Sequence, residues 1–278
     1  MALETRSLAQ FDRLVETGEL LWKEVPARHI ASQPFNFEFR VAAALAKKPM
    51  TATQKKVVNA FADSNPDFSL GLVGSKHKLI LNKFCVVRPQ FVLHTIDFVP
   101  QKQALDAADL GALWHVLTNL KSEHIAIFNC GAEAGASVGH KHMQVLPRSP
   151  HAEFQLFPDI DSVEEGIYSV QEIPFKHAIH RLPETVNEST LVNTYHNLLS
   201  HLSLGQEAPH NFILTKTWIL VIPRIRGRVG NLAANAAAMV GMVWVTSEEE
   251  YQGWTAQDPM TLLPSFGVQI EEVSTNQV

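Results

Sequence analysis

A glycine-rich loop that leads into two closely spaced histidines constrains this 278-residue sequence more than any other feature. Residues 129–147 read as the end of an apolar strand, a loop of small residues, and a second strand that begins on His140 and His142. Because side chains alternate between the two faces of a strand, His140, His142 and Gln144 are expected to share one face. The pattern therefore predicts two imidazoles and an amide beside a tight loop.

An imidazole near neutral pH can act as an uncharged nucleophile, a proton carrier or a metal ligand. The preceding loop contains Gly131, Gly135, Gly139, small alanines and the hydroxyl of Ser137, so its backbone N–H groups can approach a phosphate closely. An anion-binding loop beside a nucleophilic histidine indicates phosphoryl or nucleotidyl transfer. By spacing alone, a metal half-site or a solvated strand edge would also explain two histidines two residues apart.

The composition is typical of a soluble globular enzyme, with 46% apolar and 18% charged residues. A net charge of -5 disfavours a nucleic-acid binder, because phosphate backbones select a basic face. Cys85 and Cys130 are too few for a disulfide framework, and they form no Cys-x-x-Cys pair for zinc. Residues 1–22 mix charges among apolar positions, unlike a signal peptide, and no apolar run of about 18 residues predicts a membrane span. We expect a cytoplasmic protein that acts on small molecules, in an oligomeric state that the sequence leaves open.

The segment His140-Lys141-His142-Met143-Gln144 resembles the His-x-His-x-Gln motif in the transferase branch of the histidine triad superfamily. Asn129 and Ser137 match the Asn and Ser that stand eleven and three residues before the first histidine of that motif. Four further segments resemble one family within the branch, the diadenosine tetraphosphate phosphorylases, or ATP adenylyltransferases. These segments are 39–49, 79–84, 173–178, and 215–218 with Pro223 and Arg224.

The resemblance implies an α+β, histidine-triad-like fold, with a mainly antiparallel sheet, packed helices, and extra N- and C-terminal segments. It also implies an N-terminal adenylyltransferase part, residues 1–180, and a C-terminal part, residues 190–265, packed into one compact unit. Hydrophobic patterns predict the individual elements. The expected strands are 35–41, 79–87, 91–93, 212–214 and 219–222. The expected helices are 8–22, which Gly18 interrupts, one opened by Asp106 and Asp109, and 191–204. The residues after Pro147 are expected to form an irregular connection over the site.

The activity that the resemblance implies is reversible phosphorolysis of diadenosine tetraphosphate to ATP and ADP through a covalent adenylyl-histidine. In this hypothesis His142 attacks the α-phosphorus while a backbone carbonyl holds its other ring nitrogen. His140 would stabilise the phosphoryl oxygens or the leaving group. Gln144 can donate a hydrogen bond to phosphate but cannot shuttle a proton near pH 7, so we expect it to favour transfer to phosphate over hydrolysis.

The resemblance also implies a set of substrate-binding residues. Loop amides and the Ser137 hydroxyl would hold the α-phosphate, and Lys48 would reach the polyphosphate, although Lys47 is an equal candidate on chemistry and the pair could simply be solvated. Family members often carry Lys at the position of Thr246, so this chain lacks one positive contact to the distal phosphates. The predicted substrate contacts are Lys48, Asn82, Lys83, Asn129, Gly135, Ala136, Ser137, Val138, Gln144, Lys216, Asn235, Ala236, Ala237 and Met242.

Several alternatives remain open at this point. We expect no covalently bound cofactor and no protein metal site, although Mg²⁺ could neutralise the phosphate chain. Arg224, Arg226 and Arg228 either bind polyphosphate or form a solvated loop. The competing functions are a histidine triad hydrolase that uses water as acceptor, and a nucleotide-binding sensor without catalytic activity. A nucleotide-sugar transferase is disfavoured because the zinc-ligand cysteines often found there are absent.

Overall fold

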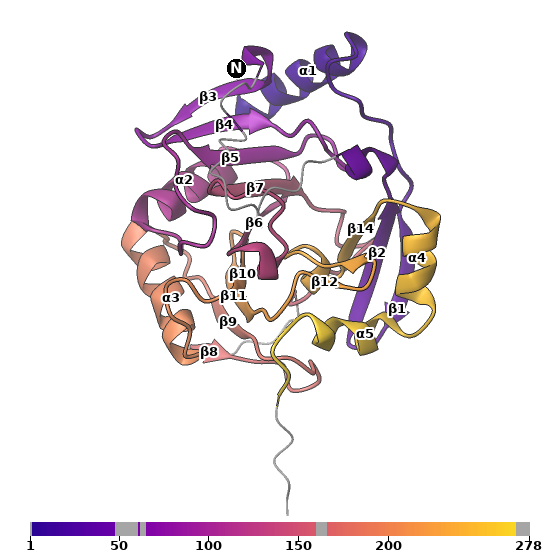
Figure 1. The fold of residues 1–278 in the computed structure, drawn as a ribbon. Helices are drawn as coiled ribbons and strands as arrows, with labels where there is room; N and C mark the ends of the chain where they lie inside the picture. Colours follow the sequence, from indigo (N-terminus) through magenta and orange to yellow (C-terminus); the bar gives the residue numbers. More distant parts are fainter. Residues whose placement is uncertain (1, 48–60, 62–64, 160–165, 271–278) are drawn as a thin grey trace, which may run out of the picture.

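A central antiparallel sheet organises the protein, whose computed structural model describes residues 2–47, 61, 65–159 and 166–270. The strand order is β3-β4-β5-β7-β6-β10-β11-β9-β8 (Figure 1). The bounds are β3 Ser69–Val73, β4 His77–Leu81, β5 Phe91–Thr95, β6 His124–Asn129, β7 His142–Pro147, β8 Ile167–Tyr168, β9 Ala178–Arg181, β10 His210–Leu214 and β11 Trp218–Pro223. The hairpin predicted from residues 212–222 is confirmed as β10 and β11, which pair antiparallel.

A second, smaller sheet joins the two ends of the chain. Its order is β1-β2-β14, in which β14 runs parallel to β2. The bounds are β1 Arg28–Ser32, β2 Phe35–Val41 and β14 Met242–Val245, and a two-stranded ribbon consists of β12 Arg228–Val229 and β13 Leu232–Ala233. The predicted strand 35–41 is confirmed as β2, and its partner β14 comes from the far end of the sequence.

Helices cover one face of the central sheet and the small sheet covers the other (Figure 1). The first face packs on α1 Leu3–Glu16, α2 Ala107–Thr118 and α3 Glu188–His201, and the small sheet carries α4 Glu248–Thr255 and α5 Pro259–Leu262. Short 3-10 turns complete the fold: η1 Ala43–Lys47, η2 Pro66–Phe68, η3 Ala132–Ala134, η4 Ala238–Val240 and η5 Leu263–Ser265. The predicted α+β class with a mainly antiparallel sheet is confirmed.

Strand β7 shows the predicted alternation of faces. Met143 and Val145 enter the core under the helices, whereas Leu146 enters the core on the side of the small sheet. His142 and Gln144 share the face of Leu146, because side chains two residues apart point the same way. The motif therefore faces away from the helix layer, toward the C-terminal segments.

The two predicted parts of the chain share their sheets. Strand β10 pairs with β6, β11 pairs with β9, and β14 pairs with β2. These pairings place strands of residues 190–265 next to strands of residues 1–180, and β9 itself extends across position 180. The sequence boundary therefore falls inside a continuous sheet.

Three local predictions are corrected. Helix α1 ends at Glu16 rather than near Trp22, because Gly18 takes a left-handed backbone with φ of 75°. Strand β4 ends at Leu81, so Asn82 and Lys83 lie in the connection to β5, where the Asn82 side chain accepts a hydrogen bond from the Phe84 N–H (3.0 Å). The described residues after Pro147 pack against the core on the small-sheet side through aromatic side chains rather than over the site.

Within the described part of the chain, no helix has the length and apolar character needed to cross a membrane.

The first residue of β10 is a buried histidine, from which we expect the fold to be sensitive to acid. The ring of His210 donates from Nδ1 to the Ala208 carbonyl (2.7 Å) and bonds the Tyr195 hydroxyl at Nε2 (2.8 Å), and burial lowers its pKa to about 4. Because an unfolded histidine titrates near pH 6.5, this contribution to stability is complete above pH 6.5 and is lost as the pH falls toward 4. We expect the free energy of unfolding to fall by about 1.4 kcal/mol per pH unit for this group.

Denaturant titrations across this pH window test the prediction. The variant His210→Gln removes the titrating group, so its stability should fall less steeply between pH 6.5 and 4 than that of the wild type. Equal slopes for the two proteins would contradict the assignment, whatever their absolute stabilities.

Candidate functional site

The His142 ring is held by a backbone carbonyl two residues earlier. His142 is the first residue of β7, and its Nδ1 lies 2.8 Å from the carbonyl oxygen of His140. A carbonyl can only accept, so Nδ1 carries the proton and Nε2 of a neutral ring holds the lone pair. This is the tautomer that the nucleophilic reading of the sequence requires.

His140 lies just before β7 and its ring is tied to the β5 side of the sheet. Its Nε2 donates to the carbonyl oxygens of Thr95 (2.9 Å) and Asp97 (3.2 Å). Burial lowers the pKa of the ring, which therefore favours the neutral form. A neutral ring that donates from Nε2 has no second N–H for a phosphoryl oxygen, so this geometry shows His140 acting on His142 through its backbone carbonyl. The predicted contact of its ring with the phosphoryl group stays a prediction.

A third histidine, which the sequence analysis missed, stands beside the motif. His94 of β5 is the cross-strand neighbour of His142, and its ring stacks on Phe61 at 4.3 Å between centroids. The Phe61 ring also meets His140 (5.2 Å) and His142 (5.7 Å) edge-on. Burial lowers the pKa of His94 to about 4, and its buried Nε2 has no hydrogen-bond partner in the described structure. The signal that could have found it is its place directly after the apolar run 91–93.

Two buried glutamines, also missed from the sequence, orient the motif. Gln101 accepts from the His142 backbone N–H (2.8 Å) and donates to the carbonyls of Asn129 (2.8 Å) and His142 (3.1 Å). Gln90 donates to the side-chain oxygen of Gln144 (2.8 Å). Because the oxygen of Gln144 is bound in this way, the other end of the amide is its donor group, which suits a phosphate oxygen.

The loop before the motif packs backbone to backbone against the C-terminal half of the chain. A Cβ on Gly227 would stand 2.5 Å from the Ala132 carbonyl oxygen, and one on Gly135 would stand 2.5 Å from that of Ala234. Both distances are shorter than any side chain tolerates, so these glycines permit the close approach. Ser137 follows in the loop, and its buried hydroxyl has no hydrogen-bond partner in the described part of the chain.

Arg224 holds these segments together from inside. It is 3% exposed and donates to the carbonyl oxygens of Ala134 (3.2 Å), Ala234 (2.8 Å) and Phe266 (3.0 Å), and to the side-chain oxygen of Asn211. Burial lowers the pKa of the guanidinium to about 9. Arg224 therefore stabilises the loops. Arg226 and Arg228 are exposed, so polyphosphate binding and a solvated loop both stay open for these two arginines.

Behind the motif, on the helix side of the sheet, lies a buried ionic network. Nζ of Lys141 donates to Asp109 Oδ2 (2.6 Å) and to the Ala104 carbonyl (2.7 Å), and His77 Nε2 bonds Asp109 Oδ1 (2.7 Å). Burial alone would raise the pKa of Asp109, but the hydrogen bond from His77 and the charge of Lys141 lower it. Asp109 also completes the capping box at the start of α2 with Asp106. The residue between the two histidines is thereby fixed to the helix layer.

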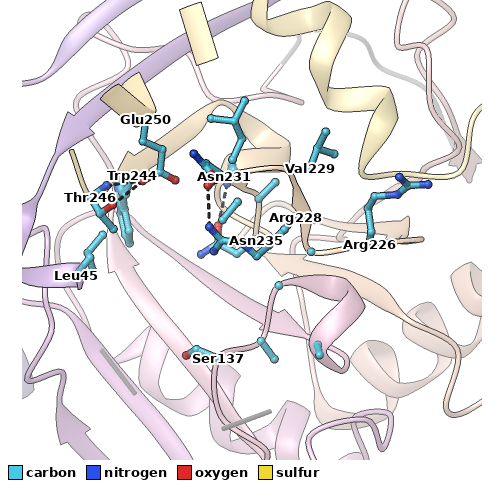
Figure 2. A pocket seen from close by; sticks show the side chains of 18 of the residues that line it. Leu45, Ser137, Arg226, Arg228, Val229, Asn231, Asn235, Trp244, Thr246 and Glu250 are labelled. Carbon is cyan, nitrogen blue, oxygen red and sulfur yellow. Dashed lines mark hydrogen bonds between the residues drawn. The ribbon is translucent and has the colours of Figure 1, made fainter. Parts of the chain in front are cut away.

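A cleft of about 1000 Å³ opens between the loop and the C-terminal segments (Figure 2). Such a volume accommodates a nucleotide. Ser137 lies across the cleft from Asn231 and Asn235. His140 and His142 are not part of its wall, but Gln144, on the same strand face as His142, is. The cleft thus brings the glycine-containing loop and the motif amide to one side of a nucleotide-sized space.

Two family descriptions match the chain along nearly its whole length. Residues 2–162 match the Ap4A phosphorylase N-terminal domain, and residues 171–269 match the ATP adenylyltransferase C-terminal domain. The chain belongs to the Ap4A phosphorylase family. The two matches leave residues 163–170 between them, whereas the sequence analysis expected the first part to extend to residue 180.

Individual relatives agree with this assignment. The chain is 30% identical over 259 residues to diadenosine 5',5'''-P1,P4-tetraphosphate phosphorylase 2 of Saccharomyces cerevisiae, an alignment that covers 78% of each chain. It is 27% identical to protein APA1 of the same yeast, over 67% of this chain and 66% of that protein. The crystal structure of yeast Ap4A phosphorylase Apa2 in complex with Ap4A shares the fold, with a TM-score of 0.82 at 24% identity, covering 98% of this chain and 99% of that one. The complex of Apa2 with AMP superposes with a TM-score of 0.83, covering 99% of each chain.

Five substrate contacts predicted for this Ap4A phosphorylase line the cleft. They are Gly135, Ala136, Ser137, Gln144 and Asn235. Seven others do not line it, because several of them hold the wall from behind: the Asn129 side-chain oxygen accepts from the Ala236 N–H (2.8 Å) and from Asn211 (2.9 Å), and Ala236 is fully buried. These seven are Asn82, Lys83, Asn129, Val138, Ala236, Ala237 and Met242.

One of the two remaining predicted lysines stands apart from the described cleft. Lys216 sits in the turn between β10 and β11, where its Nζ donates to the Leu120 carbonyl (2.9 Å) after the end of α2. It is therefore not part of the cleft wall, because the hairpin points this turn toward the helix layer. Lys48 lies outside the described residues, as does the side chain of Lys47.

The close approach at Gly227 predicts that one added methyl group disturbs the loop. In Gly227→Ala the new Cβ clashes with the Ala132 carbonyl, so the loop must shift or the fold must strain by about 1–3 kcal/mol. We expect a loss of at least tenfold in kcat/KM for the family reaction, measured together with the melting temperature. Gly205→Ala is the matched control, since nothing lies within 4 Å of a Cβ there. Similar effects of the two substitutions would refute the packing argument.

Proposed function

We propose that this protein phosphorolyses diadenosine tetraphosphate (Ap4A) to ATP and ADP through an adenylyl group carried on His142. The enzyme class, an ATP adenylyltransferase, follows from the family and from the relative of 30% identity. The observation that carries the mechanism is the hydrogen bond from Nδ1 of His142 to the His140 carbonyl, which leaves the lone pair on Nε2. The Apa2 complexes with Ap4A and with AMP support these ligands as the substrate and as the group transferred.

In the first step, Nε2 of His142 attacks the α-phosphorus of Ap4A. The new N–P bond forms as the bond from that phosphorus to the bridging oxygen breaks, and ATP leaves with the electron pair. In this proposal the loop amides and the Ser137 hydroxyl, which has no hydrogen-bond partner among the described residues, bind the α-phosphoryl oxygens. The positive charge that develops on the ring is stabilised by the His140 carbonyl at Nδ1.

In the second step, inorganic phosphate attacks the adenylyl phosphorus. The N–P bond breaks, ADP leaves, and the ring returns to its neutral form. Gln144 contributes hydrogen-bond donation only, so it provides no base that would activate water. This arrangement favours phosphate as the acceptor over hydrolysis.

Arg226 and Arg228 supply positive charge on the cleft wall. We assign them to the phosphate chain, since they are the cationic side chains among the described wall residues. No group of three His, Cys, Asp or Glu that could hold a metal occurs among the described residues. The use of Mg²⁺ with the substrate stays a prediction.

Replacement of the nucleophile gives the first test. We expect His142→Asn to lower kcat by at least 10³-fold and to abolish the covalent adenylate that the wild type accumulates when it is mixed with α-labelled Ap4A without phosphate. The control is His196→Asn, on the outer side of α3. A labelled protein that persists in His142→Asn would overturn the assignment, and turnover that does not depend on phosphate would favour a histidine triad hydrolase.

The amide of Gln144 gives a second test, on the choice of acceptor. In Gln144→His an ionisable ring replaces the amide, so we expect the ratio of AMP to ADP among the products to rise. Gln90→Leu should lower kcat/KM without changing that ratio, because it releases the Gln144 amide and the Val86 N–H from Gln90 but adds no acid or base. The ratio is measured by chromatography at several phosphate concentrations, and an unchanged ratio in Gln144→His would count against the acceptor argument.

A further inference from the structure

Strands β6 and β7, neighbours at the centre of the large sheet (Figure 1), separate before they reach His142. Their antiparallel pairing ends at Ile127 and Gln144, although β6 continues to Asn129 and β7 begins at His142. Two residues beyond the last pair, the register sets Asn129 opposite His142. Each of the two stays paired on its other side, Asn129 with β10 and His142 with β5. The sheet is therefore forked at the motif histidine.

The backbone of His142 faces across this fork. The Arg148 N–H donates to the Glu123 carbonyl (2.9 Å), and hydrogen-bonded pairs recur at every second residue of an antiparallel ladder. By that alternation the backbone N–H and C=O of Gln144, and then of His142, point toward β6. In a continuous ladder the His142 N–H would therefore bond the Asn129 carbonyl directly.

The side-chain amide of Gln101 occupies the place of that direct bond. Its oxygen accepts from the His142 N–H (2.8 Å), and its amino group donates to the carbonyls of Asn129 (2.8 Å) and His142 (3.1 Å). A side-chain amide has an acceptor and two N–H donors, so it can serve both strands at once. Gln101 is buried, so these bonds form out of contact with bulk water.

The turn that carries Gln101 is tied to both sides of the fork. On the β7 side, the Gln101 N–H donates to the Gly139 carbonyl (2.9 Å). On the β6 side, the Cys130 thiol donates to the Lys102 carbonyl (3.1 Å). Residues 101–102 therefore form a wedge that holds the two strands apart beside the glycine loop.

We propose that Gln101 is a positioning residue for the transfer reaction, which holds the backbone of His142 at the fork so that Nε2 reaches the α-phosphorus. The bond from Nδ1 to the His140 carbonyl sets the tautomer of His142, whereas Gln101 sets where the ring stands. Displacing an attacking atom by about 1 Å can cost about 10²-fold in rate. The inference rests on the proposed function, in which His142 is the nucleophile, and adds to it the residue that fixes its position.

The variant Gln101→Met removes the amide and keeps the approximate length of the side chain. We expect the rate constant for adenylylation of His142, measured in a single turnover with α-labelled Ap4A, to fall by about 10²-fold. The dissociation constant of Ap4A, taken from the concentration dependence of that rate, should change less than about threefold, because Gln101 does not line the cleft. Gln103→Met is the matched control, since Gln103 lies exposed in the same turn.

A glutamate at this position adds a readout that depends on the hydrogen bonds rather than on packing. In Gln101→Glu the protonated carboxyl group can accept from the His142 N–H and donate to the Asn129 carbonyl, whereas the ionised group can only accept. Burial raises the pKa of a carboxyl group, so the ratio of the variant's rate to the wild-type rate should rise as the pH is lowered from about 9 to about 6. This variant also decides the matter if Gln101→Met does not fold, because a ratio that stays level would overturn the inference.

Amide hydrogen exchange of the free protein separates this inference from the proposed function. In Gln101→Met the His142 N–H should exchange at least about tenfold faster, while that of Gln144, which still pairs with β6, should not change. A wild type that takes up no adenylate would defeat the proposed function, yet this change in exchange would still support the role of Gln101 in placing the His142 backbone. Unchanged exchange at His142, adenylylation of Gln101→Met at the wild-type rate, a rate lost only through weaker binding of Ap4A, or an equal loss in Gln103→Met would overturn the inference.

Discussion

The hydrogen bond between Nδ1 of His142 and the carbonyl two residues earlier determines what the motif can do. Three other rings make the same bond: His124 to Ser122 (3.0 Å), His177 to Phe175 (2.9 Å) and His210 to Ala208 (2.7 Å). His124 and His210 begin β6 and β10, as His142 begins β7, and His177 directly precedes β9. His177 and His210 use their second nitrogen on protein groups, the Val170 N–H and the Tyr195 hydroxyl. The bond thus fixes the tautomer of His142, and the position of the ring beside the glycine loop distinguishes it from the other three.

That position depends in turn on both halves of the chain. Residues of the N-terminal part supply the loop and the motif, while Arg224, Gly227 and the segment after it supply the surface against which the loop packs. The Asn211 side chain donates a hydrogen bond to the Asn129 side-chain oxygen, which joins the two halves across the neighbouring strands β10 and β6. The contacts between the halves include hydrogen bonds from side chains of one half to backbone carbonyls of the other. Neither half alone would therefore hold the Ser137 hydroxyl or the cleft wall in place.

Much of the fold and the chemical centre of the site could be predicted from the sequence. Local patterns suffice for β2, for the hairpin of β10 and β11, and for the capping box of α2, because the determinants lie within a few residues of each other. Alternation along β7 correctly placed His142 and Gln144 on one face. Resemblance to the family supplied the reaction, which the spacing of two histidines alone could not.

The features that could not be predicted from the sequence depend mostly on contacts between residues far apart in the chain. The lysine in the turn before Trp218 reads as a phosphate ligand, yet the direction of the hairpin takes Lys216 to the end of α2. Arg224 reads as a surface charge, yet it is buried because carbonyl oxygens from three segments converge on it. His94, Gln90 and Gln101 carry no local signature, because their partners in the motif lie 41 to 54 positions away or across a strand register.

The buried ionic network of Lys141, Asp109 and His77 limits which other folds could accept the motif, by recombination or by engineering. Moving the five residues 140–144 into a foreign sheet would carry along the Lys141 ammonium group. Without the Asp109 carboxylate and the Ala104 carbonyl, which accept its hydrogen bonds, that group would be buried unpaired in apolar surroundings. The transplantable piece is therefore the strand together with the helix start under it. The reactive ring of His142 on one face of the sheet and the Lys141–Asp109 ion pair on the other therefore have to be transferred together.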